Sequence, residues 1–217
     1  MTRRPEATSA GYIRFLNLPV IRSIRAAEDA AINGIFNERV RPSDSVLEIG
    51  AGTGYYTLNF ARAAKKITAI DSNLSMVKHL QAEIERAQVR NVEIVTGDFL
   101  KYPDGTTHDW VIALGVMEYQ KNPSEFLSKL ISLSHKWVLV TFPTPGIWGR
   151  IYRGTSRLNN THINLFSKSD IQRDHGSSIV YLEDVGLKSR VSGGLTLICL
   201  LECRGGGSSA GGVLPLL

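Results

Sequence analysis

The stretch "VLEIGAGTGYYT", residues 46–57, combines an apolar run with three closely spaced glycines, Gly50, Gly52 and Gly54. Glycines in such a turn let the backbone approach a nucleotide-like ligand closely. A dinucleotide-binding turn needs its third glycine where this chain has Tyr55, although a glycine stands one position earlier. The spacing therefore weakens the dinucleotide interpretation without excluding it.

Acidic residues stand beside this loop and after two later apolar runs. Glu48 lies two residues before the loop, where it suits a ligand with an ammonium group better than a pyrophosphate. Asp71 ends the run "KITAID", and its carboxylate can accept from ribose hydroxyls, which dinucleotides and S-adenosyl-L-methionine (SAM) both present. Asp98, in "GDF", can accept from an exocyclic adenine amine, with Phe99 beside the ring. Because SAM carries a sulfonium and no phosphate, acids on either side of the loop favour SAM.

Short apolar runs alternate with helical patterns from Val46 to about Cys203, which is typical of a parallel sheet with crossover helices. The expected strands are "SVLEIG", "KITAID", "VEIVTG", "DWVIAL", "KWVLVTF", "LKSRVS" and "LTLICLLEC". Helices are expected in "YYTLNFARAA", "NLSMVKHLQAEIERAQ", "PSEFLSKLISLS" and "SKSDIQRDHG". The last two strands, joined only by "GG", predict a hairpin and hence one antiparallel strand. One helix has an expected apolar stripe of Leu74, Val77, Leu80, Ile84 and Ala87.

Composition predicts an ordinary globular protein with one main domain. The chain has 217 residues, 43% hydrophobic and 21% charged, with a net charge of +5. We divide it into an N-terminal helical cap (1–40), a main domain (41–204) with an insertion at about 144–168, and a disordered Gly/Ser-rich tail (205–217). Neither a secretory signal nor a membrane span of roughly 18 apolar residues is evident, so we expect a cytoplasmic protein.

The two cysteines, Cys199 and Cys203, predict buried thiols in a reducing compartment. Four residues apart on a strand, they would lie roughly 13 Å apart, too far for a disulfide. Their spacing also lacks the partners of a zinc site.

Four stretches resemble, in order, the first four motifs of class I SAM-dependent methyltransferases: "VLEIGAGTG", "AIDSN", "VTGDFL" and "WVIALGVMEY". The resemblance is good over roughly residues 40–145. It implies a Rossmann-like α/β fold: a seven-stranded, mostly parallel sheet with an antiparallel C-terminal hairpin and helices on both faces. It also implies SAM as the cofactor, held by Glu48, Gly50, Ala51, Gly52, Gly54, Asp71, Ser72, Asp98, Phe99 and Leu114.

The first half also resembles rRNA adenine dimethyltransferases. Those enzymes grip the adenine amine with an Asn-Leu/Ile-Pro-aromatic motif after the fourth strand, where this chain has "ALGVMEY". The missing motif argues against adenine chemistry and makes a nucleic-acid substrate unlikely. Cytosine C5 methylation needs a cysteine nucleophile, and both cysteines lie on the last strand.

The second half is more similar to small-molecule methyltransferases of quinone, tetrapyrrole and lipid pathways. In "GTSRLNNTHINLFSKSDI", the residues His162, Phe166, Ser167, Asp170 and Ile171 fill the places of a motif found in ubiquinone-type O-methyltransferases. That likeness implies a small-molecule or lipid-like acceptor, with O-methylation the favoured reaction and N- or C-methylation open.

Three residues are candidates for the chemistry of transfer. His162 has the right residue type for a general base, although a packing role is an alternative, and Glu118 and Tyr119 are expected near the acceptor. Some relatives hold a metal through Glu-x-x-Glu-His after the fourth strand. Here the matching positions are Gly115, Glu118 and Tyr119, so we expect no catalytic metal.

Substrate contacts are expected from Tyr12, Trp148, Tyr152 and Arg153. The last three lie in an arginine-rich aromatic loop that would serve as a lid for an apolar acidic substrate or contact a membrane surface; equally, its aromatics could pack into the core. The oligomeric state stays open. The rival functions are an RNA or protein methyltransferase and a SAM-binding regulator without catalysis.

Overall fold

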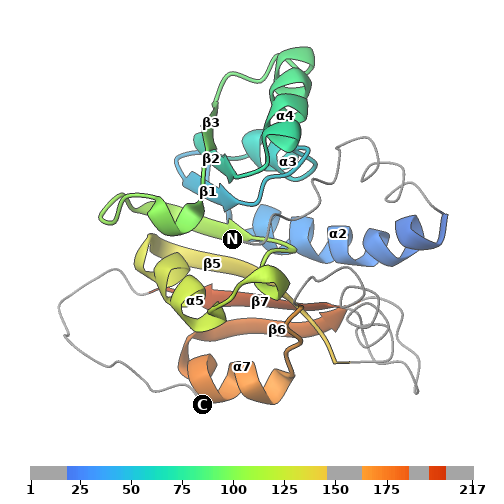
Figure 1. The fold of residues 1–217 in the computed structure, drawn as a ribbon, viewed down its shortest axis with the longest axis vertical. Coiled ribbons are helices and arrows are strands. Elements are labelled where there is room, and N and C mark those ends of the chain that lie inside the picture. Colours follow the sequence, from blue (N-terminus) through green and yellow to red (C-terminus); the bar gives the residue numbers. More distant parts are fainter. Residues whose placement is uncertain (1–18, 146–162, 186–195, 204–217) are drawn as a thin grey trace.

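The computed structural model describes residues 19–145, 163–185 and 196–203. These residues form a seven-stranded sheet in the order β3-β2-β1-β4-β5-β7-β6 (Figure 1). All neighbouring strands are parallel except at β7, which is antiparallel to both β5 and β6. The strands are β1 Ser45–Ile49, β2 Lys66–Asp71, β3 Val92–Thr96, β4 His108–Ala113, β5 Ser134–Pro143, β6 Ile179–Val185 and β7 Thr196–Glu202. The expected fold class is confirmed.

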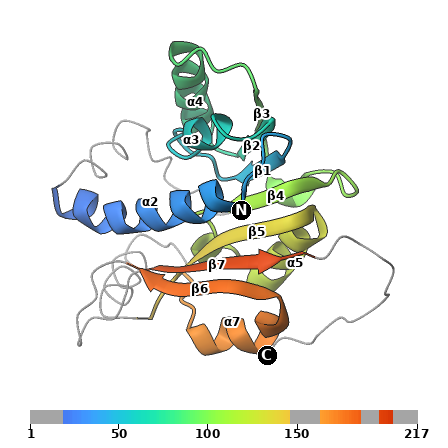
Figure 2. The same ribbon diagram turned by 180° about the vertical axis from the view of Figure 1, so that it is seen from behind.

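Helices cover both faces of this sheet, as Figures 1 and 2 show from opposite sides. On one face α2 (Pro19–Arg39), α3 (Thr57–Ala61) and α4 (Leu74–Arg86) pack over the side chains of Trp110 and Ile112. On the other face α5 (Pro123–Ser132) and α7 (Lys168–His175) pack over Val111 and Ala113. Successive β4 residues therefore serve two separate cores, which explains why the central strands are apolar at nearly every position.

Asparagine residues stand at the starts of two helices, α4 and α5. Asn73 begins α4 by accepting from the amides of Ser75 and Met76. Asn122 and Pro123 begin α5. These caps satisfy amides that have no partner inside the helix, and so they fix where each crossover returns to the sheet. Among the described helices, none is both long and apolar enough to cross a membrane.

The structure differs from the sequence predictions at two elements. The sixth strand of the described sheet is "IVYLEDV" at Ile179–Val185, which was not among the strands expected from the sequence; the expected strand "LKSRVS" and its "GG" turn lie at 187–194, outside the described residues. As an edge strand, β6 is nowhere fully buried, so its sequence lacks a strong apolar pattern. In α4 the buried residues are Met76, Leu80 and Ile84, whereas Leu74 is 65% exposed.

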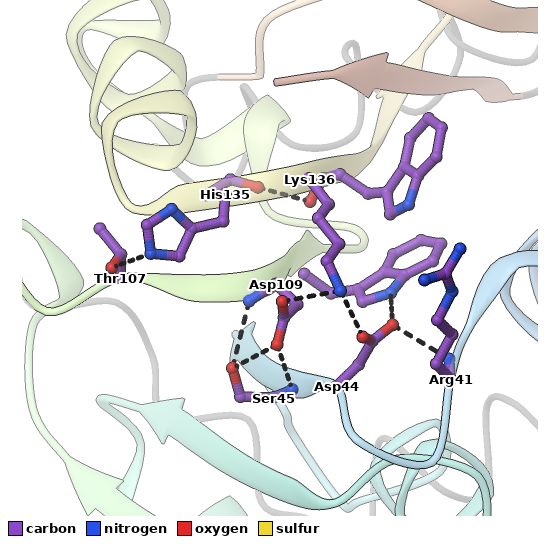
Figure 3. Close-up of polar contacts among 10 residues, drawn as sticks. Arg41, Asp44, Ser45, Thr107, Asp109, His135 and Lys136 are labelled. Atoms are coloured by element: carbon purple, nitrogen blue, oxygen red, sulfur yellow. Dashed lines mark hydrogen bonds and ion pairs between the residues drawn. The ribbon is translucent and has the colours of Figure 1, made fainter. Parts of the chain in front are cut away.

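A charged cluster joins the starts of the three central strands (Figure 3). The Lys136 ammonium lies 2.6 Å from Asp44 and 2.9 Å from Asp109. Asp44 also accepts from the Trp110 indole at 3.1 Å, and Asp109 accepts from the Ser45 amide at 2.8 Å. The cluster therefore connects β1, β4 and β5 at the end of the sheet opposite their carboxyl termini.

Candidate functional site

A cleft of about 450 Å³ opens where β1, β2, β3 and β4 end. Ligands of open α/β sheets bind at this edge because the loops that follow the strands diverge there. The lining residues come from the ends of β1 and β2, from the segments that follow the four strands and from α5: Ile49, Gly50, Ile70, Asp71, Ser72, Gly97, Asp98, Phe99, Gly115, Val116, Tyr119, Gln120 and Phe126.

The glycine loop adopts a backbone that side chains disfavour. Gly50, Gly52 and Gly54 have φ values of +73°, +56° and +85°. A Cβ at Gly50 would lie 2.6 Å from Val116, and one at Gly54 would lie 2.4 Å from Leu80, so these two glycines allow close packing. A Cβ at Gly52 would meet nothing closer than 3.9 Å. Gly52 therefore leaves open space beside the loop, as a loop that cradles a ligand requires.

Alanine substitutions should separate these roles. Gly54→Ala should lower the free energy of unfolding by about 2–5 kcal/mol, because it adds left-handed strain to overpacking. Gly52→Ala should cost only the strain, about 1–2 kcal/mol, and should weaken SAM binding at least tenfold because its methyl group occupies the open space. Urea unfolding and calorimetric titration with SAM measure the two effects. Equal stability losses with unchanged SAM affinity would contradict this assignment.

Asp71, at the end of β2, braces the loop from the neighbouring strand. One carboxylate oxygen accepts from the Gly52 amide at 2.8 Å and the other from the Asn73 amide at 2.8 Å. Each oxygen keeps a further lone pair for a ligand hydroxyl. The side chain predicted to bind ribose thus also holds the loop and the start of α4 in place.

Glu48 lies on β1 beneath the loop and is 4% exposed. Burial raises the pKa of its carboxyl to about 8. The nearby Thr57 hydroxyl lowers the pKa in part, although the two groups do not form a hydrogen bond of regular geometry, and the Asp71 carboxylate raises it further. One of its oxygens is buried and accepts no hydrogen bond. Such an atom favours a cationic donor, which is the partner predicted for Glu48 from the sequence.

The raised pKa of Glu48 gives stability a definite pH dependence. Between its ordinary value near 4.5 and about 8, the folded protein holds a proton on Glu48 that the unfolded chain has lost. Stability without cofactor should therefore fall as pH rises from 5 to 8. Glu48→Gln should make that fall smaller, so that the stability of the variant increases relative to that of the parent as pH rises to 8. Urea midpoints at pH 5, 6.5 and 8 test this, and parallel curves for the two proteins would refute it.

Asp98 and Phe99 follow β3 at the other side of the cleft. Asp98 caps the short helix η1 (Phe99–Lys101) by accepting from the Leu100 amide at 3.0 Å, and its side chain is exposed. Phe99 is 4% exposed and packs edge-on against Phe126, with ring centroids 5.0 Å apart. Both line the cleft, and there they provide an acceptor beside an apolar wall.

The remaining predicted residues divide into three groups. Ser72 and Tyr119 line the cleft. Ala51 and Leu114 instead pack into the core on the α2 side of the sheet, and Glu118 has one oxygen near Gly115, a cleft residue. The third group lies outside the described residues: Tyr12, Trp148, Tyr152, Arg153 and His162.

Sequence reasoning missed the residues that close the cleft above the fourth strand. Val116 contacts Gly50, and Gln120 and Phe126 line the wall. Asn164 ties the returning chain to this wall: its amide donates to the Glu118 carbonyl at 2.9 Å and its side chain to the Gln120 carbonyl at 2.6 Å. The sequence signal for this turn is Gly115, a glycine that directly follows an apolar run; in the structure its φ is +65°.

A larger cavity, about 620 Å³, lies where β4, β5 and β6 begin, and includes His135, Glu202 and Cys203. Its described lining contains no glycine, and its one acid, Glu202, ends the antiparallel strand β7 rather than a parallel strand beside a glycine turn, so we place the functional site in the smaller cleft. Within the described residues, no group of three or more His, Cys, Asp or Glu side chains is placed to hold a metal ion.

Burial raises the pKa of the Cys199 thiol to about 12, so this cysteine stays a neutral thiol at neutral pH.

Residues 46–135, which supply the loop and most of the cleft, match the family model described as "Methyltransferase domain". Residues 46–135 are a methyltransferase domain. SAM is the cofactor that this family uses, so the family and cofactor expected from the four motifs are confirmed.

Relatives of the methyltransferase domain act on different acceptors. A probable (S)-tetrahydroprotoberberine N-methyltransferase from Papaver bracteatum is 30% identical over 112 residues, which are 50% of this chain and 31% of that protein. A probable ribosomal RNA small subunit methyltransferase A from Methanosarcina mazei is 45% identical over 60 residues, 28% of this chain and 21% of that protein. The chain thus spans a third or less of these curated relatives.

The solved magnesium protoporphyrin IX methyltransferase from Synechocystis, with bound SAH, superposes with a TM-score of 0.71. The alignment covers 93% of this chain and 97% of that one at 20% identity. At this identity the likeness establishes the fold of the methyltransferase domain and leaves its acceptor open.

Proposed function

We propose that the protein transfers a methyl group from SAM to a small-molecule or lipid-like acceptor, by O-methylation. The observation that carries the cofactor assignment is charge. The described residues that line the cleft include Asp71 and Asp98 and no Lys, Arg or His, and Glu48 stands on β1 two residues before Gly50. A pyrophosphate would meet two carboxylates without a compensating cation, whereas a sulfonium and an ammonium are attracted to them.

Three features of the chain fit SAM. Glu48 has a buried oxygen without a donor, Gly52 leaves open space beside the loop, and Asp71 and Asp98 offer acceptors for ribose and adenine. Bound SAM supplies an intrinsically electrophilic methyl group. The chain's own task is then to orient the acceptor and to exclude water, with Tyr119 at the cleft wall in a position to help.

The acceptor side rests on the residues that follow the fourth and fifth strands. Asn164, near the end of the 144–168 insertion, donates to the carbonyls of Glu118 in η2 (Met117–Tyr119) and of Gln120, which lines the cleft. His162, two positions earlier in the sequence, stays our proposed general base. Tyr12, Trp148, Tyr152 and Arg153 stay proposed substrate contacts, with an apolar acidic acceptor or a membrane-surface lipid as the chemistry that they suit.

RNA methylation is the second candidate, favoured by the 45% identity to the ribosomal RNA methyltransferase over 60 residues. The fourth-strand turn argues against it, because "ALGVMEY" lacks the Asn and Pro that hold a flipped adenine.

The test uses SAM with a labelled methyl group, incubated with the protein and a cell extract that is then separated into lipid, small polar, RNA and protein fractions. Label in the lipid or small polar fraction supports the proposal, and label in RNA or protein supports the rival. Asp71→Ala is the inactive control, and Asp104→Asn, at an 87% exposed side chain, is the matched active one. SAM binding without label in any fraction would favour a regulator without catalysis.

A further inference from the structure

The helix α2, which precedes the methyltransferase domain, is hydrogen-bonded through one carboxylate to the two residues that follow the glycine loop. Asp29 accepts from the Tyr56 hydroxyl at 2.5 Å on one oxygen and from the Tyr55 hydroxyl at 2.7 Å on the other. Both tyrosines directly follow Gly54, and Tyr56 is the residue just before α3 begins. α2 and α3 lie on the same face of the sheet (Figure 2).

Asp29 stands on a well-anchored part of α2. One and two turns further along, Ile32 and Phe36 are fully buried on the sheet. Phe36 packs on Phe60 of α3, with ring centroids 4.4 Å apart, and Phe60 stacks with Tyr56 at 5.8 Å. Apolar contacts thus fix the positions of both partners, while the hydroxyl–carboxylate bonds fix the orientation of the tyrosine rings.

We propose that Asp29 is a positioning residue for SAM: by holding Tyr55 and Tyr56, it keeps the loop 50–54 in its ligand-binding shape. The proposal rests on the proposed function of the cleft. A loop with three glycines at positive φ has much conformational freedom to lose, and a fixed point at its end removes that loss before SAM binds. Asp71 fixes the loop from the β2 side, and Asp29 fixes it from the α2 side.

The hydrogen bonds from Tyr55 and Tyr56 to Asp29 differ in how much they contribute to holding the loop. Tyr56 is half-buried, so its bond to Asp29 competes little with water, whereas Tyr55 is 49% exposed. The Tyr56 bond therefore carries most of the effect. Because coupling is reciprocal, SAM binding also holds α2 against the loop, and amide hydrogens of α2 around Asp29 exchange more slowly in the SAM complex.

The experiment measures SAM affinity by calorimetry on the full chain. Tyr56→Phe keeps the ring and removes only the hydroxyl; it and Asp29→Ala each raise the SAM Kd about fivefold to tenfold. The double variant is no weaker than either single one, because both remove the same bond. Asp29→Asn lies between Asp29→Ala and the parent, since its amide oxygen still accepts. Tyr55→Phe weakens binding less than Tyr56→Phe does, and Glu38→Ala, a control at an exposed acid of the same helix, stays within twofold of the parent.

Three outcomes would overturn the proposal: unchanged affinity in Tyr56→Phe or Asp29→Ala, additive losses in the double variant, or α2 exchange that ignores SAM. A purely structural role for Asp29 would lower the unfolding midpoint without changing the Kd of the folded protein. If the parent itself fails to bind SAM, the proposed function fails and this proposal with it. Binding by the parent with equal binding by the variants contradicts only the role of Asp29.

Discussion

Replacing Asp71 by alanine should weaken SAM binding about a hundredfold or more. The carboxylate accepts from the amides of Gly52 and Asn73, so its loss releases the glycine loop and the start of α4 together. Hydrogen bonds to charged groups contribute about 1.5–3 kcal/mol each, and about 1.4 kcal/mol corresponds to a tenfold change in Kd. Two lost bonds therefore account for about two orders of magnitude before any lost contact to the ligand is added.

Asp71→Asn sharpens this prediction, because it preserves the shape of the side chain. An asparagine presents one acceptor oxygen and one NH₂ group to the two amide donors, so one of the two bonds must be replaced by donor–donor repulsion. We expect calorimetry to find its SAM affinity close to that of Asp71→Ala. Asp104→Asn, at an exposed acid, controls for net charge. SAM affinity within threefold of the parent for Asp71→Ala would rule out the cleft as the SAM site.

The residues that sequence alone located are those whose position follows from local pattern. Gly50, Asp71 and Asp98 each stand where an apolar run stops, and the parallel arrangement of strands then brings all three to one edge of the sheet. Their convergence needed only the strand order, which the alternation of strands and helices indicates. The lining positions of Ser72, Phe99 and Tyr119 follow in the same way, because each neighbours such a strand end.

The residues that sequence missed depend on contacts between distant segments. Val116 fills the space that Gly50 leaves, and Phe126 packs on Phe99 from another helix. No local spacing connects these pairs. The same reason applies to Ala51 and Leu114: they are next to cleft residues in sequence, yet their side chains pack into the core on the α2 side, since successive residues at a strand end alternate in direction.

Replacing Lys136 by methionine should cause a large loss of stability, although Lys136 lies at the end of the sheet opposite the cleft. The substitution leaves Asp44, which is 1% exposed, and Asp109 facing each other without the ammonium that separates them. Breaking a buried ion pair costs about 3–5 kcal/mol. Because the Lys136 side chain is 39% exposed and Asp44 keeps its bond from Trp110, we expect about 2–4 kcal/mol. Thermal unfolding should show a fall of about 4–16 °C, at about 2–4 °C per kcal/mol for a domain of this size.

Acid should reduce the difference in stability between the parent and Lys136→Met. Burial alone would raise the pKa of Asp109, but hydrogen bonds from the Ser45 amide, Lys136 and the Ser45 hydroxyl outweigh burial and hold the pKa below its ordinary value near 3.8. The stabilisation is therefore present above about pH 4 and disappears as pH falls through the lowered pKa. The gap between the parent and Lys136→Met should thus narrow in acid, as urea midpoints at pH 3, 4 and 7 would reveal.

Two matched variants decide whether charge or packing is responsible for the Lys136 effect. Lys66→Met breaks an ion pair with Glu93 in which both side chains are 55% exposed, so its cost should stay below about 1 kcal/mol. Adding Asp44→Asn to Lys136→Met removes the uncompensated buried charge and should restore part of the lost stability. If the loss came from poor packing instead, the double variant would be less stable than Lys136→Met. Because the cluster lies at the opposite end of the sheet from the cleft, SAM affinity of folded Lys136→Met should equal that of the parent. A weaker affinity would mean that the starts of β1, β4 and β5 set the geometry of the loop at their ends, and the two ends of the sheet could no longer be treated as independent.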